Sequence, residues 1–251
     1  MSVSRILFLM VLALASVALA TAQAKTPAPT ATPTKAPAST SNSTLTIEEL
    51  YLSQEVEVQL LRTQASANNR DSKLLALQDI QGMIDQGKVT QDSKEVVTIL
   101  EALAGEGVYR ETRTNGVVSN DFPDVRRSAV ELLGKVGGKA SFDILTKVLL
   151  NDKEPMVQAQ AIYALGTVPD VSKESLKYIA EVLHNNSARQ EPDENLAMSG
   201  LLSLEKISGK VGGVNDPEVI NEIIVIAFNN QFPKIVQNRA KKLLEIFRTA
   251  K

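Results

Sequence analysis

The 251-residue sequence contains no cysteine, no tryptophan and a single histidine. Without cysteine the chain forms no disulfide and offers no thiolate as a nucleophile or metal ligand. A zinc site of the usual kind, or a serine–histidine–aspartate triad, would have to rely on His184 alone. His184 ends a predicted helix, where a cation suits the helix dipole. The sequence also lacks a phosphate-binding glycine motif, so we expect no enzymatic activity and no cofactor.

Aromatic residues are scarce as well, at 4% of the chain, although 43% of the residues are hydrophobic. Ala, Leu, Val and Ile must therefore fill the core, which favours helices packed on helices. An excess of positive charge is also lacking, because the formal net charge is -2. A general nucleic-acid binder usually needs a basic surface, so we expect no nucleic-acid partner.

The long hydrophobic run of the chain lies at its N-terminus, where ILFLMVLALASVALA fills residues 6–20 after a short basic start. Small residues follow in the A-x-A pattern of a signal-peptide cleavage site. The run is shorter than the 18 or so apolar residues usual for a membrane span. We predict a signal peptide over residues 1–24 and a periplasmic or secreted mature protein without an integral span. No cysteine follows the run for lipidation; an uncleaved membrane anchor is the alternative.

Residues 25–44 read KTPAPTATPTKAPASTSNST, in which proline recurs among threonine, alanine and serine. A segment of this composition cannot bury enough apolar surface to offset the entropy of ordering it. We predict a disordered linker here and place the folded domain at residues 45–251.

One helix pattern recurs within residues 45–251. DFPDVRRSAVELLGKV begins at Asp121 and KEPMVQAQAIYALGTV begins 32 residues later, at Lys153. Apolar residues in both follow one face of a helix, with a small residue at the centre of the stripe. Weaker copies occur before and after these two. The central small residues are Ala76, Ala129, Ala161, Gly200 and Ala240. We predict that they lie at close helix crossings.

Second helices are predicted between these copies, and several begin with a good capping residue. The predicted N-caps are Ser93, Ser141, Ser172 and Asp216. Gly134 and Gly166 lower helix propensity, which predicts either close packing or a helix end nearby.

The stretches DFPDVRRSAVELLGKVGGKASFDILTKVLL and KEPMVQAQAIYALGTV resemble HEAT repeats of the short bacterial type also seen in phycobilisome-lyase-like proteins. The resemblance covers about residues 70–250. It implies a right-handed α-solenoid of stacked antiparallel helix pairs with a protein-binding role. Some HEAT-type proteins are metal hydroxylases with paired His-Glu motifs. Here His184 is followed by Asn185, so that activity does not carry over.

One segment departs from the regular array: residues 105–121, GEGVYRETRTNGVVSND. VYRETRT and VVSN flank an Asn-Gly dipeptide, which is favoured in type I′ turns. We predict a small β-hairpin insertion. Insertions in solenoids often lie on the binding face, so Tyr109, Arg110 and Arg113 are candidate partner-binding residues. The alternative is a loop that only fills a gap in the packing.

Together these patterns predict an exported, non-catalytic scaffold that binds another protein in the cell envelope. The alternative is an accessory enzyme or chaperone-like factor acting on a cofactor or an envelope polymer. A pocket lined by carboxylates would favour the enzyme, and a flat or apolar groove would favour the scaffold.

Overall fold

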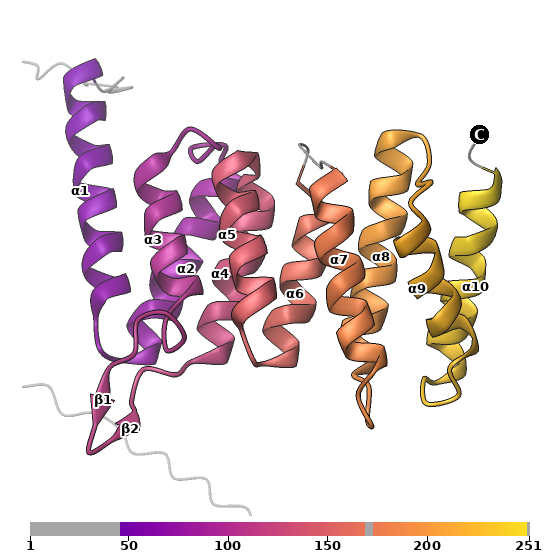
Figure 1. Ribbon diagram of the computed structural model, residues 1–251. Coiled ribbons are helices and arrows are strands. Elements are labelled where there is room, and N and C mark those ends of the chain that lie inside the picture. Colours follow the sequence, from indigo (N-terminus) through magenta and orange to yellow (C-terminus); the bar gives the residue numbers. More distant parts are fainter. Residues whose placement is uncertain (1–45, 169–172, 250–251) are drawn as a thin grey trace, which may run out of the picture. The chain divides into compact units, whose positions relative to one another are not determined.

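A computed structural model of the chain describes residues 46–168 and 173–249 (Figure 1). These residues form ten helices and one two-stranded antiparallel hairpin. The helices are α1 (Ile47–Ser66), α2 (Arg70–Asp85), α3 (Lys94–Ala104), α4 (Pro123–Val136), α5 (Gly138–Asn151), α6 (Pro155–Leu165), α7 (Lys173–Ser187), α8 (Glu194–Val211), α9 (Pro217–Phe228) and α10 (Lys234–Thr249). The strands are β1 (Arg113–Thr114) and β2 (Val117–Val118). The predicted signal peptide and linker lie outside the described residues.

The helices of this unit stand in two rows, and successive helices run in opposite directions (Figure 1). Each helix packs against the helix two places along the chain, so α2, α4, α6, α8 and α10 form one row and the odd-numbered helices form the other. The even-numbered row is the more closely packed at its centre, where α6 contacts both α4 and α8 extensively. This arrangement is an all-α solenoid with a small β insertion, as the sequence predicts.

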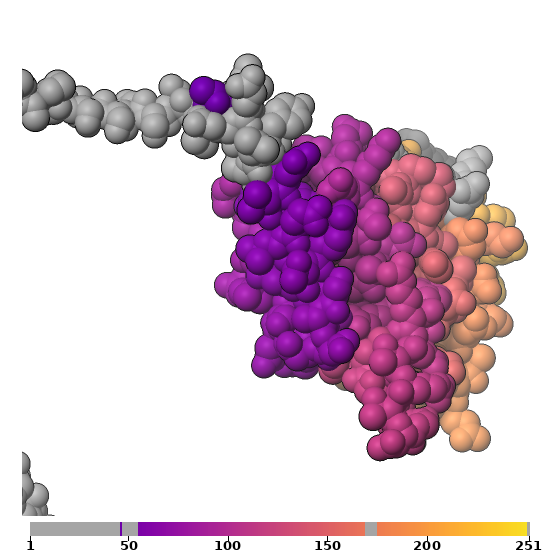
Figure 2. Space-filling view, turned by 90° about the vertical axis from the view of Figure 1, so that its left-hand side faces the viewer, coloured from indigo at the N-terminus to yellow at the C-terminus, as the bar shows by residue number. Residues whose placement is uncertain are grey.

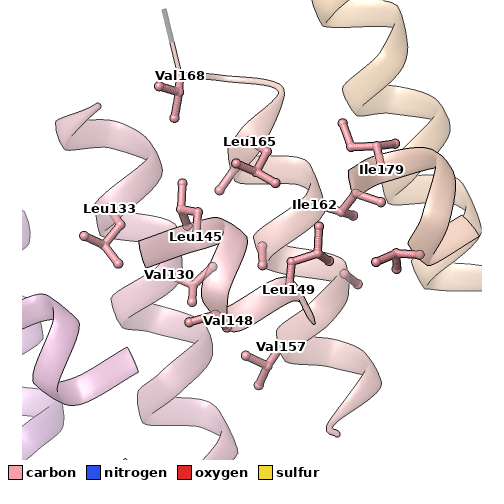
Figure 3. Packing of buried hydrophobic residues seen from close by; sticks show 14 of the residues in the cluster. Val130, Leu133, Leu145, Val148, Leu149, Val157, Ile162, Leu165, Val168 and Ile179 are labelled. Atoms are coloured by element: carbon pink, nitrogen blue, oxygen red, sulfur yellow. The ribbon is translucent and has the colours of Figure 1, made fainter. Parts of the chain in front are cut away.

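Aliphatic side chains fill the space between the rows (Figure 3). Leu133 of α4, Leu145 of α5 and Ile162 of α6 are fully buried. Burial of one such side chain contributes roughly 1.5–3 kcal/mol. They belong to one cluster of buried side chains that extends from Leu61 of α1 to Phe247 of α10. The core is therefore continuous along the stack.

The small residues at the centre of the repeat are buried, as close helix crossings require. The four alanines at the centre of the stripe are completely buried, and Gly200 is buried as well. A Cβ atom added to Gly200 would lie 2.6 Å from a methyl carbon of Leu183. One added to Gly134 would lie 2.8 Å from Cβ of Ala164. Neither glycine leaves room for a side chain, so close packing explains both.

The predicted helix starts were partly right. Asp216 caps α9 and accepts the backbone N–H groups of Glu218 and Val219. Ser93 precedes α3, but its hydroxyl oxygen accepts the N–H of Thr90 instead of capping the helix. The prediction of Ser141 as a cap was wrong, because α5 begins at Gly138 and buries Ser141 inside the helix. Two glycines with positive φ angles, residues 137 and 138, let the chain turn there without a longer link. Ser172 lies outside the described residues.

Candidate protein-binding surfaces

The insertion between α3 and α4 contains the predicted hairpin and projects beyond the ends of the neighbouring helices (Figures 1 and 2). Arg113 pairs with Val118. Asn115 and Gly116 have φ angles of 53° and 81°, the positive values that a type I′ turn requires. The first strand is shorter than predicted, because Val108 and Tyr109 form a turn closed by hydrogen bonds to the Gly105 carbonyl. Tyr109 therefore lies before the first strand and not within it.

Tyr109 packs against α5. Its hydroxyl group donates a hydrogen bond to the Lys147 carbonyl oxygen at 2.6 Å. The Lys147 ammonium lies 4.5 Å from the centre of the Tyr109 ring. Burial raises the pKa of Tyr109 to about 12. The side chain is 37% exposed, so it both anchors the insertion and leaves part of the ring on the surface.

The two arginines of the predicted contact are exposed. Arg113 is held within the hairpin, where its Nε donates to Glu111 at 2.9 Å and a terminal nitrogen donates to the Gly116 carbonyl at 3.1 Å. Arg110 contributes its carbonyl oxygen to the Asn120 side-chain amide at 2.6 Å. The structure thus places Arg110 and Arg113 on the surface of one small insertion, and their role in binding stays a prediction.

A buried polar network joins the insertion to the helices. The Lys73 ammonium of α2 pairs with Glu106 at 2.8 Å. Arg126 of α4 donates to the Glu106 carbonyl at 3.2 Å and pairs with Asp152 at 2.7 Å. Asn120 holds the two ends of the insertion together by accepting from Thr112 and donating to the carbonyl of Arg110. This network was not predicted from the sequence. Its signal is a basic residue inside the apolar stripe, three positions before the central alanine.

A second surface lies on the even-numbered row, where α4, α6 and α8 form a groove of about 420 Å³. Helix α6 contains no charged residue, whereas α4 and α8 carry both acidic and basic ones. The groove is lined by Glu131, Gly134, Lys135, Gln160, Tyr163, Ala164, Thr167 and Lys206. Tyr163 and Gln160 are half-buried, and Met156 at the start of the same helix is 55% exposed.

Small residues form the inner part of this groove and hold its helices close together. The Thr167 hydroxyl donates to the Ala164 carbonyl at 2.6 Å, which ends α6. The Lys210 ammonium of α8 then donates to three successive carbonyl groups, those of residues 166–168, at 2.8–3.0 Å. A cation at a helix C-terminus satisfies free carbonyls and complements the helix dipole. These bonds fix α6 against α8.

Charges surround the uncharged helix. The Lys206 ammonium lies 3.6 Å from the centre of the Tyr163 ring, a cation–π contact that restrains the ring. Lys135 pairs with Glu131 at 2.8 Å and donates to Gln81 at 2.5 Å. The groove therefore has an uncharged centre containing an aromatic ring and a rim of paired or restrained charges. Its lining residues include no nucleophile paired with a base.

Two further findings concern the described residues as a whole. Among residues 46–168 and 173–249, no group of three histidine or acidic side chains is placed to hold a metal ion. Within the same ranges, no helix is both long and apolar enough to cross a bilayer. His184 lies in the last turn of α7, as predicted, but it also contacts Glu222 of α9, with 3.2 Å between Nδ1 and Oε2. No sequence pattern predicts that pair.

Two rows of antiparallel helices with small residues at their crossings define an α-solenoid. Residues 111–197 match the family model described as HEAT repeats, from within the insertion to the first turn of α8. Residues 111–197 therefore contain HEAT repeats, and such repeats typically serve as non-catalytic protein-interaction scaffolds. No curated protein sequence matches the chain significantly.

One solved structure with a detectable similarity is the cryo-EM structure of a de novo designed 16-helix transmembrane nanopore. It is 16% identical over 80% of this chain, and the alignment covers 62% of the nanopore chain. The TM-score is 0.16, so this similarity carries no argument about fold or function.

Proposed function

We propose that the protein is an exported, non-catalytic HEAT-repeat scaffold that binds a partner protein in the cell envelope through the groove between α4, α6 and α8. One observation carries the choice of surface: α6 has no charged residue, yet it presents Tyr163, Gln160 and Met156 at the surface between charged helices. The centres of protein interfaces are depleted of charge and enriched in Tyr and Met, and their rims are polar.

Preorganisation also favours this groove. Binding orders side chains, and each flexible one costs about 0.5–1.5 kcal/mol. The Tyr163 ring already lies against Lys206, and the end of α6 is already fixed by Lys210. Tyrosine is among the residues most often found at interface hot spots. Tyr163 is therefore the side chain that we expect to contribute most.

The envelope location rests on the sequence alone, on the signal-peptide pattern of residues 1–24 and the proline-rich composition of residues 25–44. Intact-mass measurement of the exported protein tests it. We expect a mature chain that begins near Lys25. A mass that includes residues 1–20 would instead support the membrane-anchored alternative.

The binding surface is tested by substitution. Pull-down from an envelope extract with the mature protein first identifies the partner, and titration then measures the affinity. Tyr163→Ala should weaken binding at least tenfold, or about 1.4 kcal/mol. Tyr178→Ala is the matched control, because Tyr178 is also half-buried but lies on α7, in the other row. Equal affinities of the two variants would place the partner on another surface.

The hairpin is a second surface for the same partner. Tyr109 is a poor probe because its loss removes an anchor of the insertion. Arg110→Ala together with Arg113→Ala should leave the melting temperature nearly unchanged, since both side chains are exposed. A loss of affinity in this double variant would extend the binding surface to the hairpin. Wild-type affinity would leave the insertion with a packing role only.

A further inference from the structure

A groove on the odd-numbered row lies between α7 and α9 and has a volume of about 400 Å³. This size is within the range of small-ligand sites. It is lined by Lys177, Ala180, Glu181, His184, Glu218, Asn221 and Glu222. None of these residues takes part in the groove around Tyr163, so the two surfaces are separate.

Glu222 distinguishes this groove from an ordinary charged surface. The residue is 3% exposed, although it lines the groove. Its Oε2 lies 3.2 Å from Nδ1 of His184. Its Oε1 is buried and has no hydrogen-bond partner. A buried carboxylate oxygen without a partner costs about 1–3 kcal/mol or more, so a donor that reaches Oε1 would be stabilised.

The charges around Glu222 select the sign of the ligand. Glu181 and Glu218 are exposed carboxylates on the two walls, and Lys177 is the basic residue beside them. The groove thus holds three carboxylates against one lysine and one histidine. A cationic group gains from this field, and an anionic group is repelled.

We propose that this groove binds a primary ammonium group carried on a short alkyl chain. The three N–H donors of an ammonium group point in different directions, so they can reach carboxylates on separate helices. A guanidinium group prefers both oxygens of one carboxylate, and Oε2 of Glu222 is already in contact with His184. The site therefore favours the ammonium group over the guanidinium group.

His184 provides a direct reporter of binding. Its side chain is 73% exposed and contacts the Glu222 carboxylate directly, so a ligand that binds this carboxylate changes the surroundings of the ring. It is also the single histidine of the chain, so its imidazole resonances in an NMR spectrum need no assignment. Titration of the mature protein with n-butylamine at constant, mildly alkaline pH should shift these resonances in a saturable manner.

The first test variant removes the charge of the buried carboxylate and keeps the shape of the side chain. Glu222→Gln should weaken n-butylamine binding at least tenfold, with helicity checked by circular dichroism. Should this variant unfold, Glu218→Gln provides the test at an exposed position, with an expected two- to fivefold weakening. N-butylguanidine should bind more weakly than n-butylamine to the wild-type protein.

Two further ligands distinguish between the two sources of the ammonium group. Cadaverine represents a free diamine, and the peptide Gly-Lys-Gly represents a lysine side chain of a protein. Tighter binding of either one supports the site and names its source. The proposal is wrong if the His184 spectrum is unchanged with all amines, or if Gly-Lys-Gly and its Nε-acetylated form give an equal response. It is also wrong if Glu222→Gln or Glu218→Gln binds n-butylamine as tightly as the wild-type protein does. None of these results bears on the Tyr163 groove.

Discussion

The two halves of the solenoid fill the same helix position with different chemistry. This position lies three residues before the central small residue of each even-numbered helix. In the N-terminal half it holds Lys73 and Arg126, and in the C-terminal half it holds Gln158, Ala197 and Gln237. The repeats therefore share their apolar packing but not their polar contacts.

The charged residues connect one repeat to the next. Lys73 donates to the Ala65 carbonyl before its own helix and pairs with Glu106 after α3, each at 2.8 Å. Arg126 donates to the Glu106 carbonyl before its helix and pairs with Asp152 after α5. Each cation thus reaches in both directions along the stack.

The side chains of the two glutamines bond only to groups that precede them in the chain. Gln158 donates to the Leu149 carbonyl at 3.3 Å. Gln237 donates to the carbonyls of Phe232 and Asn229 at 2.8 and 3.1 Å. At this helix position no charged side chain connects the repeats of this half, although Lys210 and Arg239 connect them at other positions. The comparison also explains the insertion: a buried lysine needs a buried carboxylate, and the insertion supplies Glu106.

The largest expected effect follows from breaking a charged connection. Arg126→Ala leaves Asp152, whose side chain is 1% exposed, as a buried charge without its main partner. Loss of one member of a buried ion pair costs about 3–5 kcal/mol. Urea denaturation monitored by circular dichroism measures the change. Arg127→Ala, on the exposed side of the same helix, should change stability by less than about 0.5 kcal/mol.

Similar urea midpoints for Arg126→Ala and Arg127→Ala would show that the charged connection does not distinguish the N-terminal half from the C-terminal half. Arg126→Gln sharpens it further, because it gives α4 the residue that α6 and α10 have. We expect this variant to remain destabilised, since Gln lacks the charge that Asp152 requires.

The apolar packing should respond alike in both kinds of repeat. Ala129 and Ala161 are completely buried at helix crossings. Replacement of either by Leu overpacks the crossing and should cost about 1–3 kcal/mol. Denaturant midpoints again provide the measurement. The helical phase places Ser128 and Gln160 toward solvent, but both residues are half-buried in the structure. The control is therefore Arg127→Leu, at an exposed position of the same helix as Ala129. A small effect at one alanine alone would show that the two repeats also differ in their packing.

A neutral connection should contribute less to the free energy of unfolding than a charged one. Gln237→Ala removes the donor to two carbonyl groups, of which the bond to Phe232 is buried. The expected loss is about 1–2 kcal/mol, within the range for a buried group that loses its partner. A loss as large as that of Arg126→Ala in the same urea experiment would mean that charge is not what distinguishes the halves.

The sequence predicts the apolar part of this structure well. Helix periodicity identifies the repeated helices, and the small residues at their centres mark the crossings. The start of α5 could not be predicted in the same way. The glycine-rich sequence before it suggests a longer link, but positive φ angles at Gly137 and Gly138 allow a shorter turn.

The polar contacts were harder to predict, since they join residues far apart in the chain. Glu106 lies 33 positions from Lys73, and His184 lies 38 positions from Glu222. No periodicity relates such residues. For the same reason the groove around Tyr163 could not be predicted, because its lining residues come from three different helices. The hairpin was predicted from its Asn-Gly turn, which is a local signal.

The smallest expected effect concerns the insertion that supplies Glu106. Tyr109→Phe removes the hydrogen bond to the Lys147 carbonyl and should cost about 0.5–1.5 kcal/mol at neutral pH. The pKa of Tyr109 is raised to about 12 in the folded protein, above the value of about 10 for an unfolded chain. The neutral phenol therefore stabilises the fold fully below about pH 10, and this contribution is lost as the pH rises through about 12. Urea midpoints of wild type and Tyr109→Phe should approach each other between about pH 9 and pH 12. A constant difference across that range would show that the phenol does not couple its ionisation to folding, and that the insertion is held by the Lys73 and Arg126 network alone.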